Sequence, residues 1–451
     1  MRRKLRGLAS RLKNFKLAPN ENYPTVQDAA LLATIQEAFS ELGTFHLEPG
    51  IVQGRRGQKA IFTGLNPAPP HLANTRLVAK VSFVTEPAVR ASFLRRTHTH
   101  RALAAAGAPL PEVVGFSETS SVHGFPLTVA THPVSQTADR RLASAEEPER
   151  TRVLQNTGAA LKKLHSVSLA TTQPTGPHAE DIRHSIHAIS QSKTPENAAA
   201  FVKAGVRRAR MTLGTYVARR GAQILRSSFS ARAARGQNSA RPLGTVEHRA
   251  LANLAFVRPA FRRVRELRKE LHAKNALHTP PVWIHTDIHQ PKIGLDDADQ
   301  VTLLDPDDVR LGYQEEEFHK AYWYLIEEDG NADRAQALNN AEALGRGYGA
   351  LPDHFEERLQ LAIGVRLLDT LGYWLNRTDT RDTAAQERRD RFLQKYKERI
   401  IKWTKGEYPD PELVRTFMSA SGTRAHRPPT LGGRDGDPPL GQGPHGRRPT
   451  R

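Results

Sequence analysis

The chain of 451 residues contains no cysteine. This absence excludes disulfide bridges, thiolate zinc sites and cysteine nucleophiles, and because it suits a reducing compartment we expect a cytoplasmic protein. Long apolar runs are also missing, since none approaches the roughly 20 residues that a helix needs to cross a bilayer. No apolar segment follows the basic pair Arg2 and Arg3, so we do not expect a secretion signal at the N-terminus.

Acidic residues are scarce relative to basic ones, and the formal net charge is +19 at pH 7. Such a balance favours polyanions such as nucleic acid, anionic lipid or nucleotide phosphates. The excess is concentrated in residues 203–274, whereas acids gather at 305–308, 315–317 and 327–329. Aromatic residues are too sparse in the basic block to form a stacking platform for bases. We therefore prefer a solvated helix face for this block over a docking surface for a polyanion.

Hydrophobic periodicity predicts a strand-rich first part of the chain. Residues 25–42 have helical apolar spacing, and residues 45–83 contain short strand-like runs, of which 75–84 alternates with the period of a half-buried strand. A helix is expected over 87–106, ended by Gly107, and two more strands follow it. We interpret residues 1–44 as a basic leader with an N-terminal helix, and residues 45–133 as a compact first lobe.

The second part of the chain is predicted to be mainly helical, over residues 134–405. It includes a basic insertion at about 203–274, with a flexible segment at 227–244, and a β-hairpin at 282–308. Residues 406–451 are predicted to be a largely disordered tail, because large apolar residues almost disappear from about Ser419 onward.

The hairpin region contains the residues that point to chemistry. An apolar strand, Val282 to Ile284, places His285 and Asp287 at its end, and the last strand of the hairpin ends at Asp305. Phosphoryl transfer needs two such carboxylates, one to orient a hydroxyl and accept its proton and one to hold magnesium. A structural explanation remains open on these residues alone, because Asp is common at strand ends and in turns.

The segments HTDIHQPKIGL (285–295) and LLDPDD (303–308) resemble the H-G-D-x-x-x-x-N loop and the metal-binding segment of aminoglycoside phosphotransferases and their relatives, such as choline kinases. The resemblance implies an α+β, two-lobed protein-kinase-like fold, with a small β-rich N-lobe and a large, mainly helical C-lobe. It also implies Mg²⁺-dependent transfer of the γ-phosphate of ATP or GTP to a hydroxyl of a small molecule, which would be aminoglycoside-like, an amino alcohol or sugar-like.

By this resemblance Asp287 is the catalytic base, His285 supports its loop, and Asp305 binds magnesium. LVAKVSF (77–83) resembles the strand whose lysine, here Lys80, contacts the nucleotide phosphates. Gly54 and Gly57 lie where a phosphate-covering loop belongs, although glycines in a hairpin are usually turn residues only.

The acceptor side of the site is less defined by the sequence. By resemblance, Asp307, Asp308 and Glu317 are candidate substrate contacts. The acids at 315–317 and 327–329 have two interpretations: a site for a cationic acceptor walled by the aromatic residues 322–324, or a solvated acidic helix face over an aromatic core stripe. We prefer the second.

Three positions depart from the family pattern. Lys292 stands where a metal-binding Asn belongs, and an ammonium cannot ligate Mg²⁺ but is a candidate phosphate contact. Arg96 falls where the helix Glu that pairs with the strand lysine is expected, and Thr286 replaces a Gly. An alternative function is therefore a degenerate kinase that acts as a binding or scaffold protein, for instance through the basic insertion.

Overall fold

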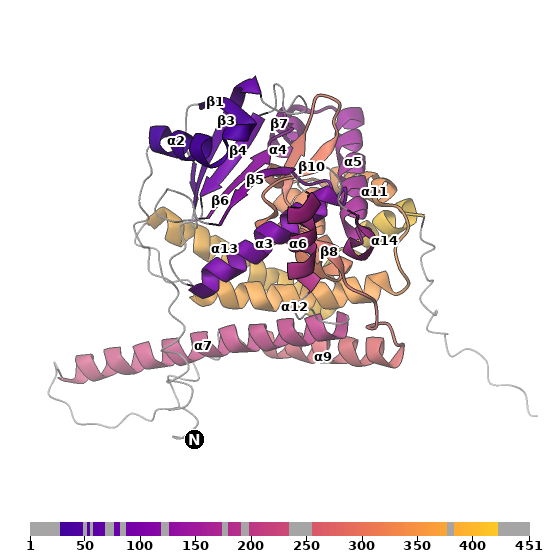
Figure 1. Ribbon diagram of the computed structural model, residues 1–451. Coiled ribbons are helices and arrows are strands. Elements are labelled where there is room, and N and C mark those ends of the chain that lie inside the picture. Colours follow the sequence, from indigo (N-terminus) through magenta and orange to yellow (C-terminus); the bar gives the residue numbers. More distant parts are fainter. Residues whose placement is uncertain are drawn as a thin grey trace, which may run out of the picture.

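A computed structural model describes residues 28–47, 52–54, 57–67, 76–81, 87–118, 126–173, 179–190, 198–233, 255–376 and 383–422. Strands from the N-terminal third lie together at one end of the molecule, and most helices of the later chain lie below and beside them (Figure 1). Helices and antiparallel sheets together confirm the predicted α+β class. The division into a first lobe of residues 45–133 and a second lobe of residues 134–405 stays a prediction.

The main sheet is antiparallel and has the strand order β1–β3–β4–β6–β5, with β2 paired to β3. Its strands are β1 (Gly43–Leu47), β2 (Val52–Gly54), β3 (Gly57–Pro67), β4 (Arg76–Val81), β5 (Val113–Ser117) and β6 (Leu127–Thr131). In β4 the side chains of Leu77, Ala79 and Val81 are buried and alternate with partly exposed ones, as predicted. Lys80 therefore lies on the opposite face of β4 from this apolar row.

A single long helix, α3 (Pro87–Ala105), connects β4 to β5. It begins at a proline, which tolerates the first turn of a helix, and ends before Gly107, whose φ of 82° suits a glycine C-cap. The predicted helix is confirmed. α3 contacts the short helical turn Pro306–Asp308, so it links the sheet to the segment that follows Asp305.

The later chain is built on a large helical core. The helix α11 packs against α5 and α14, and α12 packs against α7, α13, α10 and α9. The helices are α2 (Asp28–Ala38), α4 (Ala138–Ser144), α5 (Glu147–His165), α6 (Ala179–Ser190), α7 (Ala198–Ala233), α9 (Val257–Ala273), α10 (Gln314–Ala321), α11 (Arg334–Tyr348), α12 (Phe355–Asn376), α13 (Thr383–Lys405) and α14 (Pro411–Ala420). A π-helical turn, Tyr322–Ile326, extends α10.

Two small antiparallel sheets lie in the helical part. In one, β9 (Ile293–Leu295) pairs with β10 (Val301–Leu303) and with β7 (Gln136–Thr137), which confirms the hairpin around the turn at 296–300. In the other, β8 (Val282–Ile284) pairs with β11 (Arg310–Gly312). The strand before Asp287 therefore belongs to a different sheet from the hairpin that ends at Asp305, although the two segments adjoin.

Two boundaries differ from the prediction. Helix α14 lies within the predicted tail and buries Leu413, Val414, Phe417 and Met418, because these residues repeat at helical spacing and pack on α11. The start of the predicted flexible segment, residues 227–233, is the end of helix α7. Residues 1–27 and 423–451, where we predicted most of the leader and of the tail, lie outside the described residues. No helix in the described ranges is long and apolar enough to span a membrane.

Candidate active site

Asp287 follows β8 closely, in a loop with an unusual backbone conformation. The preceding Thr286 has a φ of 65°, a left-handed conformation that is costly for a β-branched residue and that glycine adopts freely. Its hydroxyl donates a hydrogen bond to the carbonyl oxygen of Asp308 at 3.1 Å. The fold thus keeps the conformation that the family glycine would favour, and holds it with a side-chain contact.

Glu317 of α10 anchors this loop from inside the protein. Its Oε2 accepts a hydrogen bond from the backbone amide of His285 at 2.5 Å, and its Oε1 accepts one from the amide of Thr286 at 3.0 Å. Burial opposes ionisation of Glu317, but contacts with His165 and His285 hold its pKa below the ordinary value. The side chain of Glu317 is fully buried at this position, and its predicted contact with the acceptor stays a prediction.

His285 connects the Asp287 loop to the segment that leads to Asp305. Its ring is fully buried, and its Nε2–H donates to the carbonyl oxygen of Leu304 at 2.9 Å. Burial lowers the pKa of His285, so the imidazole is neutral at pH 7. Through one hydrogen bond the ring fixes the spacing between two aspartate-bearing segments, which is the geometry expected of a scaffold residue.

Asp305 forms ion pairs with two lysines from distant parts of the chain. Lys80 of β4 lies 3.7 Å from its Oδ1 and also forms an ion pair with Asp307. Lys292, at the end of the short turn Gln290–Lys292, forms an ion pair with Oδ2 of Asp305. Asp305 itself has a φ of 58°, a second non-glycine residue in the left-handed region beside the cleft. The sheet and the hairpin thus converge on one carboxylate.

Asp287 is paired with a residue that the sequence did not single out. Lys320 of α10 donates a hydrogen bond to Oδ1 of Asp287, and the His289 ring lies 3.7 Å from Oδ2. Burial raises the pKa of Asp287, but His289 and Lys320 outweigh this and hold it below the ordinary value. Lys320 follows Glu317 by three residues and so lies on the same helix face. This spacing was the only feature of the sequence that could have placed Lys320 near the Asp287 loop.

The departure at Arg96 has a structural counterpart. Arg96 of α3 forms an ion pair with Asp308 at 3.0 Å. Lys80, in turn, pairs with Asp305 and Asp307. A cation on the helix and a carboxylate after the hairpin therefore connect α3 to the segment 306–308.

Two cavities adjoin Asp287. The larger, of about 780 Å³, is lined by Lys80, Asp305 and Asp307 and by a group of aromatic residues, namely Trp323, Tyr324, Tyr373, Trp374 and Tyr396. The smaller, of about 550 Å³, runs along α3 and β11. The two cavities share five of their lining residues: Arg208, Asp287, Asp308, Lys320 and Arg366. The structure therefore brings Lys80, Asp287, Asp305 and Asp308 to one cleft.

The acids that follow the hairpin do not face this cleft as a free acidic surface. Glu315 is fully buried and pairs with Arg358 at 2.8 Å, and Glu316, also buried, pairs with Arg310 at 2.5 Å. Glu327 pairs with Arg399 at 3.2 Å. Neither an acidic acceptor site nor a solvated acidic face describes residues 315–317, because Glu315 and Glu316 are buried against arginines and Glu317 is buried against the amides of the Asp287 loop.

The predicted phosphate-covering loop is described only at its strands. Gly54 at the end of β2 pairs with Gly57 at the start of β3, which makes a hairpin. Residues 55–56, at its tip, lie outside the described residues.

The sequence comparison agrees with the site. The profile of the phosphotransferase enzyme family APH matches residues 72–354, which is more than half of the chain and includes Lys80, Asp287 and Asp305. The chain belongs to this family of phosphotransferases. No curated protein matches its sequence.

Solved structures of low sequence identity align over most of the chain. A thermostable mutant of the aminoglycoside phosphotransferase APH(4)-Ia, in a ternary complex with AMP-PNP and hygromycin B, is 14% identical, with 84% of this chain and 99% of that chain covered and a TM-score of 0.49. Spectinomycin phosphotransferase APH(9)-Ia with ADP and its antibiotic is 12% identical, with 88% and 99% covered and a TM-score of 0.39. An ethanolamine kinase of Plasmodium vivax is 10% identical, with 92% and 94% covered and a TM-score of 0.44.

Proposed function

We propose that this protein transfers the γ-phosphate of ATP or GTP to a hydroxyl group of a small molecule. The observation that carries the proposal is the convergence of Lys80, Asp287 and Asp305 on one cavity, although they come from distant parts of the chain. Family membership supports the same class of reaction. We expect the nucleotide at the Lys80 end of the cleft, with Gly54 and Gly57 covering its phosphates.

In this reaction Asp287 orients the acceptor hydroxyl and accepts its proton as the acceptor oxygen bonds to the γ-phosphorus. The bond from that phosphorus to the β-phosphate oxygen breaks, and the nucleoside diphosphate leaves. The contacts of Asp287 with Lys320 and His289 support this role, because they keep the carboxylate ionised at neutral pH. Lys80 would leave Asp307 to contact the nucleotide phosphates, a modest change for an ammonium on a flexible stem.

Magnesium fits Asp305 as the protein ligand. No set of three or more His, Asp or Glu side chains within the described ranges is arranged to hold a metal by itself. Kinase sites do not require one, since Mg²⁺ usually takes one or two carboxylates and completes its shell with phosphate oxygens and water. The hard oxygens of Asp305, with Asp307 beside it, match that chemistry. When bound, the ion would neutralise charge on the phosphates.

Thermal unfolding with and without nucleotide tests this proposal. We expect ATP or GTP to raise the unfolding temperature only with Mg²⁺, and a ligand at a hundredfold over its Kd to stabilise the fold by about 2.7 kcal/mol. Asp305→Ala should remove the Mg²⁺-dependent part. Asp297→Ala, at an exposed aspartate in the turn of the same hairpin, should keep it. No shift with either nucleotide would refute the proposed nucleotide site.

A binding protein without turnover is the second candidate, and the contact of Lys292 with Asp305 favours it. An ammonium at that carboxylate competes with magnesium for the same oxygens. Such a protein could use the basic groove between α7 and α9, which is lined by Lys203, Arg207, Arg210, Arg265 and Arg268. Salt-sensitive retention on a polyanion that survives Asp305→Ala, combined with no turnover, would support this candidate. No retention at low salt would count against it.

A further inference from the structure

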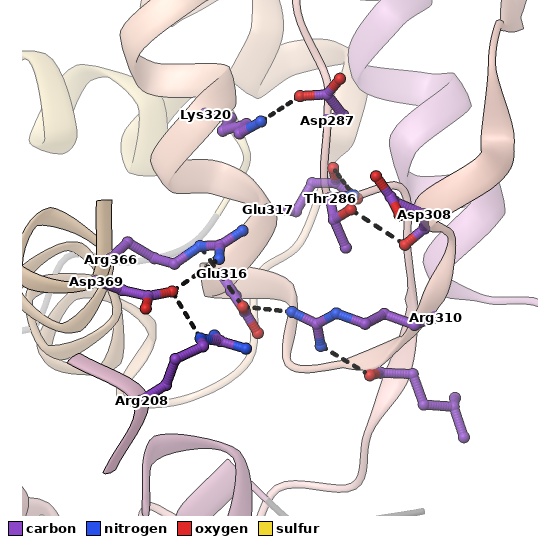
Figure 2. Close-up of polar contacts among 11 residues, drawn as sticks. Arg208, Thr286, Asp287, Asp308, Arg310, Glu316, Glu317, Lys320, Arg366 and Asp369 are labelled. Carbon is purple, nitrogen blue, oxygen red and sulfur yellow. Dashed lines mark hydrogen bonds and ion pairs between the residues drawn. The ribbon is translucent and has the colours of Figure 1, made fainter. Parts of the chain in front are cut away.

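Three arginines from separate elements meet at the smaller cavity, next to Asp287. Arg208 of α7 donates to Asp369 at 2.8 Å, and Arg310 of β11 donates to Glu316 at 2.5 Å. Arg366 of α12 lies between them, 3.6 Å from Glu316 and 3.8 Å from Asp369. Figure 2 shows the three guanidinium groups around the two carboxylates, with Lys320 and Asp287 beyond Arg366.

Arg366 has the features of a ligand-binding side chain. Its exposed fraction is only 18%, so packing restrains it, yet it lines both cavities next to Asp287. Both of its ion-pair distances are longer than a hydrogen bond, and among the described residues its five N–H donors make no hydrogen bond. A planar guanidinium with free donors is suited to bind a carboxylate or phosphate with two parallel hydrogen bonds.

The charge around the smaller cavity is positive. Six basic side chains line it: Arg95, Arg96, Arg208, Arg310, Lys320 and Arg366. In the described part of the chain only four carboxylates lie within ion-pair distance of them: Asp287, Asp308, Glu316 and Asp369. Two positive charges are therefore unmatched. A cationic acceptor would meet repulsion here, whereas an oxyanion would complete the balance.

We propose that the acceptor carries an oxyanion, a carboxylate or a phosphate, in addition to the hydroxyl that receives the phosphoryl group. Arg366 binds the oxyanion, Arg208 assists it from α7, and the hydroxyl faces Asp287. This inference rests on the proposed function, because it assigns the substrate class of the same cleft. It separates this protein from phosphotransferases whose acceptors are cationic.

Four sugars with one ring scaffold test the inference: glucose, cationic glucosamine, and the anionic glucuronate and glucose 6-phosphate. Their affinities are measured from unfolding temperatures at constant ionic strength, with MgADP saturating so that an anion cannot simply enter the nucleotide site. We expect at least one anionic sugar to bind tenfold or more tightly than glucose and glucosamine. The two anionic arms distinguish a carboxylate from a phosphate.

Variants of the cleft arginines test whether these residues cause the preference for an anionic sugar. Arg366→Gln should reduce it at least tenfold, and Arg208→Gln, whose side chain is 51% exposed and tolerant of change, should reduce it several-fold. Arg346→Gln, which removes an exposed arginine paired with Glu342 on α11, should leave it unchanged. Equal binding of all four sugars, a preference for glucosamine, or a preference that both cleft variants retain would overturn the inference.

The MgADP shift without sugar reports separately on the proposed function. If MgADP gives no shift while the anion preference and its loss in Arg366→Gln are observed, the oxyanion site stands and phosphoryl transfer fails. If MgADP binds and the four sugars do not differ, the inference alone fails.

Discussion

The end of the cleft proposed to bind phosphate and the end proposed to bind the acceptor neutralise charge in different ways. At the phosphate end, Lys80 and Lys292 meet Asp305, so that flexible ammonium groups cover the carboxylate proposed to hold magnesium. At the acceptor end, Arg208, Arg310 and Arg366 share Glu316 and Asp369. Lysine carries a point charge on a flexible stem and can exchange partners, whereas the rigid arginine fork is suited to bidentate oxyanion binding.

From this difference we expect the two ends to accept different ligands. If the proposed function holds, nucleotide phosphates and a metal ion would displace the lysines from Asp305 without leaving an unpaired charge, since the lysines would then contact phosphate. The arginines of the acceptor end outnumber their carboxylates, so that end gains from a further anion. Asp287 lines both cavities, and its substitution is expected to have the largest effect.

Asp287→Asn separates binding from turnover at the junction of the two ends. An amide cannot accept the acceptor proton, so we expect kcat to fall by about 10² to 10⁴, with the Mg²⁺-dependent nucleotide shift retained. Steady-state release of nucleoside diphosphate, together with thermal unfolding, measures both. Unchanged turnover would remove Asp287 from the catalytic role.

Glu317→Gln should loosen the Asp287 loop. The amides of His285 and Thr286 need two acceptor oxygens, and glutamine offers one oxygen and a donor that opposes an amide. We expect the free energy of unfolding to fall by about 1–3 kcal/mol. Urea denaturation measures the loss. Glu342→Gln, at an exposed ion pair, should change stability by less than about 1 kcal/mol, and an equal loss in both variants would contradict the anchoring role.

The pH dependence of stability tests the packing beside the phosphate end. Burial lowers the pKa of His100 to about 4, while its Nε2–H donates to the carbonyl of Pro111 and Lys80 and His285 lie nearby. Between pH 6.5 and pH 4 the imidazole of His100 is protonated in the unfolded chain but stays neutral in the folded protein. The free energy of unfolding therefore falls as the pH falls from 6.5 toward 4. Between pH 7 and 5 we expect about 2 kcal/mol of loss from this residue.

His100→Gln keeps a donor for Pro111 without a titrating ring, so its unfolding temperature should fall less between pH 7 and 5 than that of the wild-type protein. Parallel pH curves for the two would show that His100 does not contribute.

Lys292→Asn tests the role of lysine at the proposed phosphate end, and its expected effect is the smallest of these predictions. The change removes a cation from Asp305 and supplies the amide oxygen of the family pattern. We expect the Mg²⁺ concentration that half-saturates the nucleotide shift to fall by roughly three- to tenfold. Lys269→Asn removes an exposed lysine of α9 as a control. A Mg²⁺ requirement that responds equally to both variants would show that net charge, and not Lys292, sets it.

Local pattern was enough to predict much of the fold. The alternation in β4, the span of α3 between Pro87 and Gly107, and the turn at 296–300 all depend on neighbours in the chain, so their periodicity and turn residues are visible in the sequence. The pairing of β8 with β11 was not visible, because strands paired across a loop leave no local signal. The helix α14 was missed because its four apolar residues stand beside a long polar tail.

The sequence by itself was enough to select the candidate catalytic segments, since His285, Asp287 and Asp305 stand at fixed spacing around one hairpin. Only the tertiary structure decided what surrounds them. Lys320, Arg208 and Arg366 come from three helices and reach the cleft through helix packing, which residue spacing does not encode. Packing likewise buries Glu317, a candidate substrate contact, and makes it an anchor of the loop. Charged residues can be counted in a sequence, but which of them form ion pairs depends on the fold.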